Sequence, residues 1–352
     1  MEIRIYNRDM EFQGIIENQR SLLWNRQYNE TGDFELHCPI TPYNVSLLKR
    51  GNLVWKKGAV DAGIIEDLHI QEDSEGNEIA VKGRFLPSYY DRRLIKEICN
   101  YQNFTCEAIM KNLALIAYGY FSNLILIDES RDLPGRMSLQ VTYKNALSCI
   151  QKVAKQAQFG FRVVPNFNAK TMTFVVYQGV DRSMAQSDRA RVIFSEGYNN
   201  LSSASHDEND QVYRNVCFVG GRGTGPSRQY VAVGDTDVTG FDRREIFVNG
   251  SDISPDNLTD DEYLEALKQR GLDKLAENAL YNSIECEAIP YGNFEYGTDY
   301  DLGDIVTIKK ESWDIGENLR ITGITEVYEN GTQTIQPTFG EPVPVTANWN
   351  EE

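Results

Sequence analysis

The sequence predicts a mainly β fold with an α+β insert, made of two small β-barrel domains and a small α/β module. Short runs of alternating apolar and polar residues recur along the chain, separated by turn-forming Gly and Asn residues. The 352 residues include 19 Tyr and 15 Phe, residue types that are enriched in strands. Two stretches of the sequence also resemble each other, which points to a repeated unit.

Residues 1–98 have the pattern of an N-terminal β-barrel domain built from antiparallel strands. Turn-forming residues at Glu30–Asp33 separate two of the strands, and Asp73–Asn77 is a predicted hairpin loop. The predicted strands are Glu2–Tyr6, Phe12–Glu17, Ser21–Tyr28, Phe34–Ile40, Leu53–Trp55, Gly63–Ile70 and Glu78–Gly83.

Residues 99–182 change character and predict a small α/β domain. Thr105 can cap a helix, and a second helix follows Thr142. Their apolar positions are Ile109, Leu113, Ile116 and Ala117 in the first helix and Ala146, Ile150, Val153, Ala154 and Ala157 in the second. Two strands follow, Phe159–Val164 and Thr171–Tyr177, around a turn at Pro165–Asn168.

Residues 183–258 form a predicted β-rich segment, and residues 259–345 a long helix followed by the strands of a second β-barrel. Thr259 and Glu262 form a capping box that marks the helix start. The chain is expected to loosen from Gly340, with residues 346–352 as a flexible tail. The helix has an apolar stripe of Leu264, Leu267, Leu275 and Ala279. The predicted strands are Val192–Phe194, Val212–Gly220, Gln229–Val233, Ser283–Ile289, Ile305–Lys309, Leu319–Tyr328 and Thr334–Thr338.

The repeated unit consists of Gly51–Lys57 and Gly303–Lys310 with the segments that follow them. Each is followed by an Ile-rich strand ending near an acid, then by an acidic turn with Gly and Asn, then by a strand ending at Gly83 or Gly340. Two interpretations stay open. Strand–turn–strand units can look alike by chance, or the chain contains two barrels of the same kind.

The formal net charge of −17 disfavours nucleic-acid binding through a basic patch and binding to an anionic membrane surface. The N-terminus predicts a strand and not a signal peptide, and no apolar stretch approaches the 18 residues of a membrane span. The six Cys residues have irregular spacing and are expected to be free, buried thiols of a protein made in a reducing compartment. They are Cys38, Cys99, Cys106, Cys149, Cys217 and Cys286.

No catalytic, cofactor-binding or metal site is predicted. His37 and His69 lie in predicted strands far apart in the sequence and lack ligand spacing. His206 and Asp207 could form a cation site or a base–acid pair, but a solvated loop is the favoured interpretation. Gly220–Gly225 lacks the Lys and the helix of a phosphate-binding loop, which favours a mobile hairpin loop. Three tryptophans are expected to be core or interface anchors: Trp24, Trp55 and Trp313.

Several motifs stand out at the two ends of the chain: Ser21–Tyr28, Gly32–Leu36, Gly63–Glu66, Gly83–Leu86, Arg92–Ile95, Leu302–Thr307 and Arg320–Ile324. These motifs resemble those of a known family, the siphovirus ReqiPepy-type tail proteins, which are related to phage tail hub (baseplate hub) proteins. The resemblance covers about residues 3 to 340. The resemblance implies a hub-like fold with two similar barrels per chain and a homotrimer that forms a pseudo-sixfold ring.

The expected function is therefore that of a non-enzymatic tail hub of a phage or prophage, at the virion tail tip and made in the bacterial cytoplasm. The ring would join the end of the tail tube to the tip and let DNA pass without specific binding. Expected partners are a distal tail or tube-side ring protein, the tape measure protein, and a tip fibre or receptor-binding protein on a separate chain. Two alternatives stay open: a tail-tip cell-wall hydrolase, and the hub of a contractile injection system.

Overall fold

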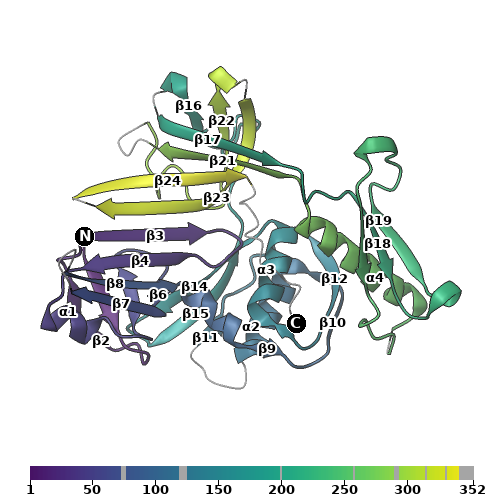
Figure 1. The fold of residues 1–352 in the computed structure, drawn as a ribbon, viewed down its shortest axis with the longest axis horizontal. Coiled ribbons are helices and arrows are strands. Elements are labelled where there is room, and N and C mark those ends of the chain that lie inside the picture. The colour runs from purple at the N-terminus through teal and green to yellow at the C-terminus, as the bar shows by residue number, and fades with distance from the viewer. Residues whose placement is uncertain are drawn as a thin grey trace.

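The computed structural model describes residues 1–72, 77–118, 125–198, 200–256, 258–288, 293–313, 315–329 and 331–340. Figure 1 shows a long sheet on one side of the molecule and a helical module beside it. A lobe built on helix α4 (Asp260–Glu277) lies at the far side of that module.

Eight strands pair in the order β17-β21-β24-β23-β3-β4-β8-β7, and every neighbouring pair is antiparallel. At one end β22 pairs with the first part of β23, and β16 pairs with β22 in parallel. The sheet therefore joins strands from both ends of the sequence. Its strands are β3 (Ser21–Gln27), β4 (Asp33–Cys38), β7 (Asp67–Glu72), β8 (Asn77–Arg84), β16 (Ile193–Ser195), β17 (Leu201–Asn209), β21 (Tyr281–Ala288), β22 (Ile305–Lys310), β23 (Ile315–Glu329) and β24 (Thr332–Gly340).

A four-stranded sheet, in the order β2-β1-β5-β6, packs against the N-terminal strands of the long sheet. Trp24 lies fully buried between the two sheets, with its ring 4.6 Å from that of Phe85 and 5.9 Å from that of Phe34. Strand alternation explains this core, since Leu22, Trp24 and then Phe34, Leu36 point to the same face. The elements are β1 (Ile3–Tyr6), β2 (Phe12–Ile16), α1 (Pro42–Leu47), β5 (Leu53–Lys56) and β6 (Gly63–Ile64).

The C-terminal strands enclose a second, separate core. Phe194 from β16 packs its ring 5.2 Å from Tyr300 and 5.3 Å from Phe339. Val306, Ile321, Ile324 and Ile335 complete the same buried cluster. Two short 3₁₀ turns, η2 (Glu196–Tyr198) and η5 (Glu311–Trp313), flank this part of the chain.

The α/β module packs α2 (Cys106–Tyr118) against α3 (Ala146–Ala157) over a third core. The predicted cap of the first helix is confirmed, because Thr105 Oγ1 accepts from the amide of Ala108 at 3.3 Å. The second helix is capped by Asn145, three residues after Thr142. The remaining elements are η1 (Leu86–Arg92), β9 (Leu94–Ile95), β10 (Cys99–Thr105), β11 (Ile125–Ile127), β12 (Arg136–Val141), β13 (Lys144–Asn145), β14 (Gly160–Asn166) and β15 (Thr171–Tyr177).

The lobe at the far side consists of a three-stranded sheet, β19-β18-β20, covered on one face by α4. The capping box predicted at Thr259 and Glu262 is confirmed. The lobe is inserted between β17 and β21, which pair with each other as a hairpin would. Its elements are β18 (Val216–Gly220), η3 (Gly225–Ser227), β19 (Tyr230–Gly234), η4 (Gly240–Asp242) and β20 (Glu245–Asn249).

Several sequence-based expectations differ from the structure. The residues around His206 and Asp207 form strand β17 and not a loop. The buried face of α4 is Tyr263, Ala266, Leu267 and Gly271, and the helix ends before Ala279, so the predicted apolar stripe was wrong in part. The cause is that Gly271 and Ala266 let the helix lie close to the sheet, where a search for large apolar residues does not find them.

The long helix packs on the strands β18, β19 and β20 that precede it. The division of the chain into domains, which groups this helix with residues 259–345, stays a prediction. The short helix α1 was not predicted, although Thr41 accepts from the amide of Asn44 and Pro42 begins the helix. The tip of the predicted hairpin loop, residues 73–76, and the tail of residues 341–352 lie outside the described residues.

The mainly β fold with an α+β insert is confirmed. The described strands form open sheets, so the two closed barrels stay a prediction. Among the described residues, no helix combines the length and the apolar character needed to cross a membrane.

Candidate interface: the seam and the end strands of the long sheet

The two halves of the long sheet meet where β3 pairs with the second part of β23. We call this pairing the seam. It is antiparallel and runs from Gln27 opposite Gly323 to Ser21 opposite Glu329. On the polar face of the sheet, Thr325 Oγ1 donates to Asn25 Oδ1 at 3.2 Å across the seam. The seam therefore fuses segments some 300 residues apart into one continuous sheet.

Buried ion pairs reinforce the seam on the core side. Arg26 is 7% exposed, and its guanidinium donates to Asp61 at 2.8 Å and to Asp301 at 2.9 Å. Burial alone would lower the pKa of Arg26, but Asp61 and Asp301 raise it well above its ordinary value. Arg26 thus remains charged and ties β3 to the C-terminal half.

A second buried pair joins β5 to β23. The ammonium of Lys56 donates to Glu326, which is 4% exposed, and to the hydroxyl of Tyr328 at 3.1 Å. Burial lowers the pKa of Lys56 below its ordinary value, although the carboxylate of Glu326 works in the opposite direction. Both halves of the chain therefore contribute charged groups to one buried polar layer.

The pairing on both sides of the seam follows one repeated pattern. In the first half, Leu53 pairs with Ile64. Ile70, six residues after Ile64, pairs with Ile79, and Ile79 also pairs with Cys38 on its other side. In the second half, Ile305 pairs with Arg320. Glu326, six residues after Arg320, pairs with Ile335, and Ile335 also pairs with Ala288 on its other side. The strands β5, β6–β7, β8, β4 and β3 thus have the same order and register as β22, β23, β24, β21 and β17.

The repeat predicted from the sequence is therefore present in the pairing. Val54 and Val306 are both fully buried, and each lies in the core of its own half. Four strands of the first repeat, β7, β8, β4 and β3, share one continuous sheet with the second repeat, whereas β5 and β6 lie in the four-stranded sheet. The repeats are therefore not separated into two independent sheets as the barrel interpretation expected.

The eight-strand path of the long sheet has two end strands, β7 and β17, while β16 lies off this path beside β22. Among the described residues, β7 pairs with β8 and β17 pairs with β21, each on one side. In the repeat, β7 corresponds to the seam part of β23, and β17 corresponds to β3. The two end strands are thus the equivalents of the two strands that meet in the seam.

The face of the long sheet that points away from the cores is polar and mainly acidic. Alternation places every second side chain of each strand on this face. On the eight-strand path from β17 to β7, its charged residues among those with described side chains are Asp33, Glu35, Asp67, Glu78, Asp207 and Glu329 against Lys82 and Arg84. The excess of carboxylates gives this face a negative potential.

His37 lies on this polar face and bridges two carboxylates. Its Nε2 lies 2.7 Å from Glu35 and its Nδ1 lies 2.9 Å from Glu78. Partial burial opposes the charged imidazole, but the hydrogen bonds to Glu78 and Glu35 raise the pKa of His37 above its ordinary value. His69 lies two strands away on the same face, because both histidines pair with Ala80. The structure thus brings near each other two histidines that are far apart in the sequence.

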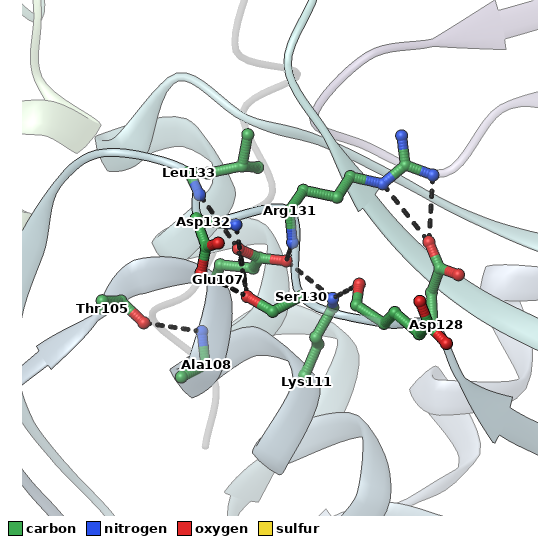
Figure 2. A network of polar contacts seen from close by, with 10 residues as sticks. Thr105, Glu107, Ala108, Lys111, Asp128, Ser130, Arg131, Asp132 and Leu133 are labelled. Atoms are coloured by element: carbon green, nitrogen blue, oxygen red, sulfur yellow. Dashed lines mark hydrogen bonds and ion pairs between the residues drawn. The ribbon is translucent and has the colours of Figure 1, made fainter.

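A buried carboxylate organises the loop after β11 in the α/β module (Figure 2). Glu107 is 2% exposed and accepts from the amides of Arg131 at 2.8 Å and Leu133 at 3.1 Å. It also accepts from Lys111 at 2.6 Å. Burial would raise the pKa of Glu107, but these donors lower it below its ordinary value. The side chain is fully engaged in holding the loop, which is a structural role.

The other candidate residues have structural surroundings. The loop at Gly220–Gly225 is the predicted hairpin loop, and the amide of Arg222 donates to the hydroxyl of Tyr263 on α4 at 2.8 Å. Trp55 donates its indole N–H to the carbonyl of Ala59 at 2.8 Å. Trp313 is 43% exposed and lies beside the ammonium of Lys310. No group of three or more His, Cys, Asp and Glu side chains with a geometry for metal binding occurs among the described residues.

The five cysteines whose surroundings are described are free and buried, as predicted. Burial raises the pKa of Cys38 to about 12 and that of Cys149 to about 11. Such thiols stay protonated and unreactive at neutral pH. The list comprises Cys38, Cys99, Cys106, Cys149 and Cys217.

The comparisons with known proteins agree with this architecture. A family model described as siphovirus ReqiPepy6 Gp37-like protein matches residues 2–341. The chain belongs to this family. No curated protein sequence matches it. The family resemblance inferred from the sequence motifs is therefore confirmed.

Solved structures of phage tail proteins have a similar fold over nearly the whole chain. One is the 43 kDa tail protein of prophage MuSo2 from Shewanella oneidensis, at a TM-score of 0.62 and 13% identity, covering 97% of this chain and 99% of that one. Another is the tail protein from Neisseria meningitidis MC58, at a TM-score of 0.60 and 13% identity, covering 97% of this chain and 96% of that one. A chain of the Francisella PdpA–VgrG complex is similar at a TM-score of 0.51 and 12% identity, covering 96% of this chain and 57% of that one.

Sequence reasoning missed the seam and the end strand β17, whereas most of β7 falls within the predicted strand Gly63–Ile70. The residues of β17 from Ser205 to Asn209 are all polar, so they carry no hydrophobic signal for a strand. Its equivalence to β3 was not visible, because Trp24 of β3 corresponds to His206 and Arg26 to Glu208, so the residue types that mark β3 are not kept in β17. The neighbouring strands β23 and β24 were predicted from their alternation, because the predicted strands Leu319–Tyr328 and Thr334–Thr338 lie within them.

Proposed function

We propose that this family member is a structural tail hub: a homotrimer that forms a ring, joins the end of the tail tube to the tail tip and lets DNA pass. The observation that carries the proposal is the repeated strand order within one sheet. Three chains with two equivalent halves each give six similar units around a threefold axis. Such a ring can contact sixfold partners on one side and threefold partners on the other.

The number of strands suits a closed ring. Three chains with eight antiparallel strands each contribute twenty-four strands. At a strand spacing of about 4.8 Å and a tilt of about 40°, the ring is roughly 150 Å around and roughly 48 Å across between backbones. This opening is wide enough for a nucleic-acid duplex with side chains on the wall.

The charge of the polar face supports a role as a conduit. If this face lines the channel, its carboxylates repel DNA phosphates, so the genome passes without adhering. The opposite face carries the apolar cores of the two halves and cannot meet water. We therefore assign the acidic face to the channel.

The proposed partners are a distal tail or tube-side ring protein, the tape measure protein, and a tip fibre or receptor-binding protein on a separate chain. The place of action is the tail tip of a virion assembled from protein made in the bacterial cytoplasm.

A hub of a contractile injection system is a second candidate, since a similar fold occurs in the PdpA–VgrG complex. A non-enzymatic role is favoured over a wall hydrolase, because the exposed carboxylates of the polar face lie on a sheet and not in a cleft.

Copy number in purified tail particles tests the proposal. Quantitative mass spectrometry with isotope-labelled peptides should give half as many copies of this chain as of the sixfold tube protein in one ring. Equal numbers, or one copy per particle, would contradict the hub. A peptidoglycan release assay on the same particles and on the isolated chain tests the hydrolase alternative, which predicts activity from the chain alone.

A further inference from the structure

We propose that the end strand β7 of one chain pairs antiparallel with the end strand β17 of a second copy, in the register that places His69 opposite Asp207. This inference rests on the proposed ring and deepens it by naming the surface that closes it. The partner is a second copy of this chain. In the seam, the second part of β23, which is equivalent to β7, pairs with β3, which is equivalent to β17.

The end strands have the exposure of an incomplete sheet. On β7, five of the six side chains are exposed, and Ile70 is exposed by 46%. Its equivalent in the seam, Glu326, is 4% exposed. On β17 the side chains from Ser205 to Asn209 are all exposed. An open edge of this length is a template for another strand, and a second copy of the sheet supplies one.

The register follows from the repeat. Asn25 of β3 corresponds to Asp207 of β17, because Asn25 pairs with Asp33 and Asp207 pairs with Ser283, at equivalent positions of β4 and β21. Thr325 of β23 corresponds to His69 of β7, one residue before Glu326 and Ile70 respectively. Asn25 pairs with Thr325 in the seam, so Asp207 should pair with His69. The full set is Asp67–Asn209, Leu68–Glu208, His69–Asp207, Ile70–His206 and Gln71–Ser205.

The strand directions allow this pairing. Eight consecutive antiparallel strands put β17 and β7 in opposite directions. A rotation about the ring axis keeps the tilt and direction of each strand, so β17 of the next copy arrives antiparallel to β7. An odd number of strands would have brought two parallel edges together. The continuous sheet can therefore close on itself without a change in its hydrogen-bond pattern.

The side chains also favour this register over its neighbours. It places an imidazole opposite a carboxylate and brings no two like charges directly together. A slip of two residues in one direction would place Asp67 opposite Asp207, and a slip of two in the other direction would separate His69 from Asp207 and leave Asp67 beyond the end of β17. Pairing with Ile79 fixes Ile70 on the core side, so a slip of one residue would place Ile70 opposite Ser205 or Asp207, whose side chains lie on the other face.

Paired cysteines test the register in the full-length protein within assembled tail particles. The variant His69→Cys with Asp207→Cys should form covalent dimers and closed trimers on oxidation, through a disulfide that mass spectrometry identifies as 69–207. The variant Asn25→Cys with Thr325→Cys is the positive control and should form the equivalent bond within one chain. The variant His69→Cys with Ser205→Cys is displaced by two residues and should give at least tenfold less product.

The outcomes separate this inference from the proposed function. Three copies per particle with no 69–207 bond above the displaced control would overturn the β7–β17 contact and leave the trimeric hub standing. A copy number other than three would overturn the hub itself. A charge exchange adds a second readout: Asp207→Lys should reduce particle yield, and adding His69→Asp should restore it. Failure of this rescue would count against the register.

Discussion

Single buried charges hold together parts of the chain that lie far apart in the sequence. Arg26 joins β3 to Asp61 and Asp301, and Glu107 holds the backbone of the loop at Arg131 and Leu133. The role of both groups is structural, because each pairs with buried donors or acceptors that would otherwise be unpaired.

Replacing Glu107 by Gln should destabilise the protein by about 1.5–3 kcal/mol, because it removes a charged acceptor from two buried amides and from Lys111. Urea unfolding at pH 7 measures this difference. The exposed Glu17→Gln is the matched control and should change the free energy of unfolding by less than about 0.5 kcal/mol.

The same carboxylate predicts a pH dependence. The folded-state pKa of Glu107 is lowered, so its stabilising contribution is present above the ordinary pKa near 4.5 and is lost as the pH falls through the folded-state value. The stability gap between wild type and Glu107→Gln should therefore narrow as the pH falls below about 4.5. A gap that stays constant down to acid unfolding would show that the carboxylate is not the stabilising species.

Replacing Arg26 by Met should cost about 3–5 kcal/mol, because Asp61 is left buried without its cation. Adding Asp61→Asn to that variant should recover part of the loss, since the unpaired charge is then removed. Unfolding measurements on the two single variants and the double variant give the coupling energy. Strict additivity of the two changes would be inconsistent with a direct ion pair.

At the level of elements, the strands of the repeat other than β17 were predicted from alternation, and the capping signals at Thr105 and Thr259 marked the starts of α2 and α4. The polar strand β17 and the seam could not be predicted. Strand alternation gives the facing of each residue, but pairing partners 300 positions apart leave no local signal. The helix α4 was found, whereas its packing face depended on Gly271, which a hydrophobicity pattern cannot weigh.

The repeat predicts equal costs for equivalent core changes. Val54→Ala and Val306→Ala should each destabilise the chain by about 2–3 kcal/mol, because both side chains are fully buried at the same position of their halves. Chemical denaturation of both variants measures this. The half-exposed Val60→Ala should change stability by well under 1 kcal/mol. A large cost in one half and none in the other would contradict the equivalence.

For the whole molecule, the central claim is that two equivalent halves in one sheet exist to build a ring. A single chain leaves β7 and β17 as the two ends of the sheet. In the proposed threefold ring, both end strands would become interior strands and the acidic face would line the channel. The seam is already paired within one chain, whereas the equivalent strands β7 and β17 are exposed. This difference fits a ring that closes only when partner proteins bring three copies of the chain together.

The mass of the complex with the tube-side ring protein tests this claim most directly. Multi-angle light scattering should give three copies of this 40.1 kDa chain per complex, about 120 kDa of hub protein in addition to the partner ring. A monomer in isolation is compatible with the account, because the partner ring can bring the end strands together. A complex that holds one copy of the chain, with the partner ring present in full, would contradict it.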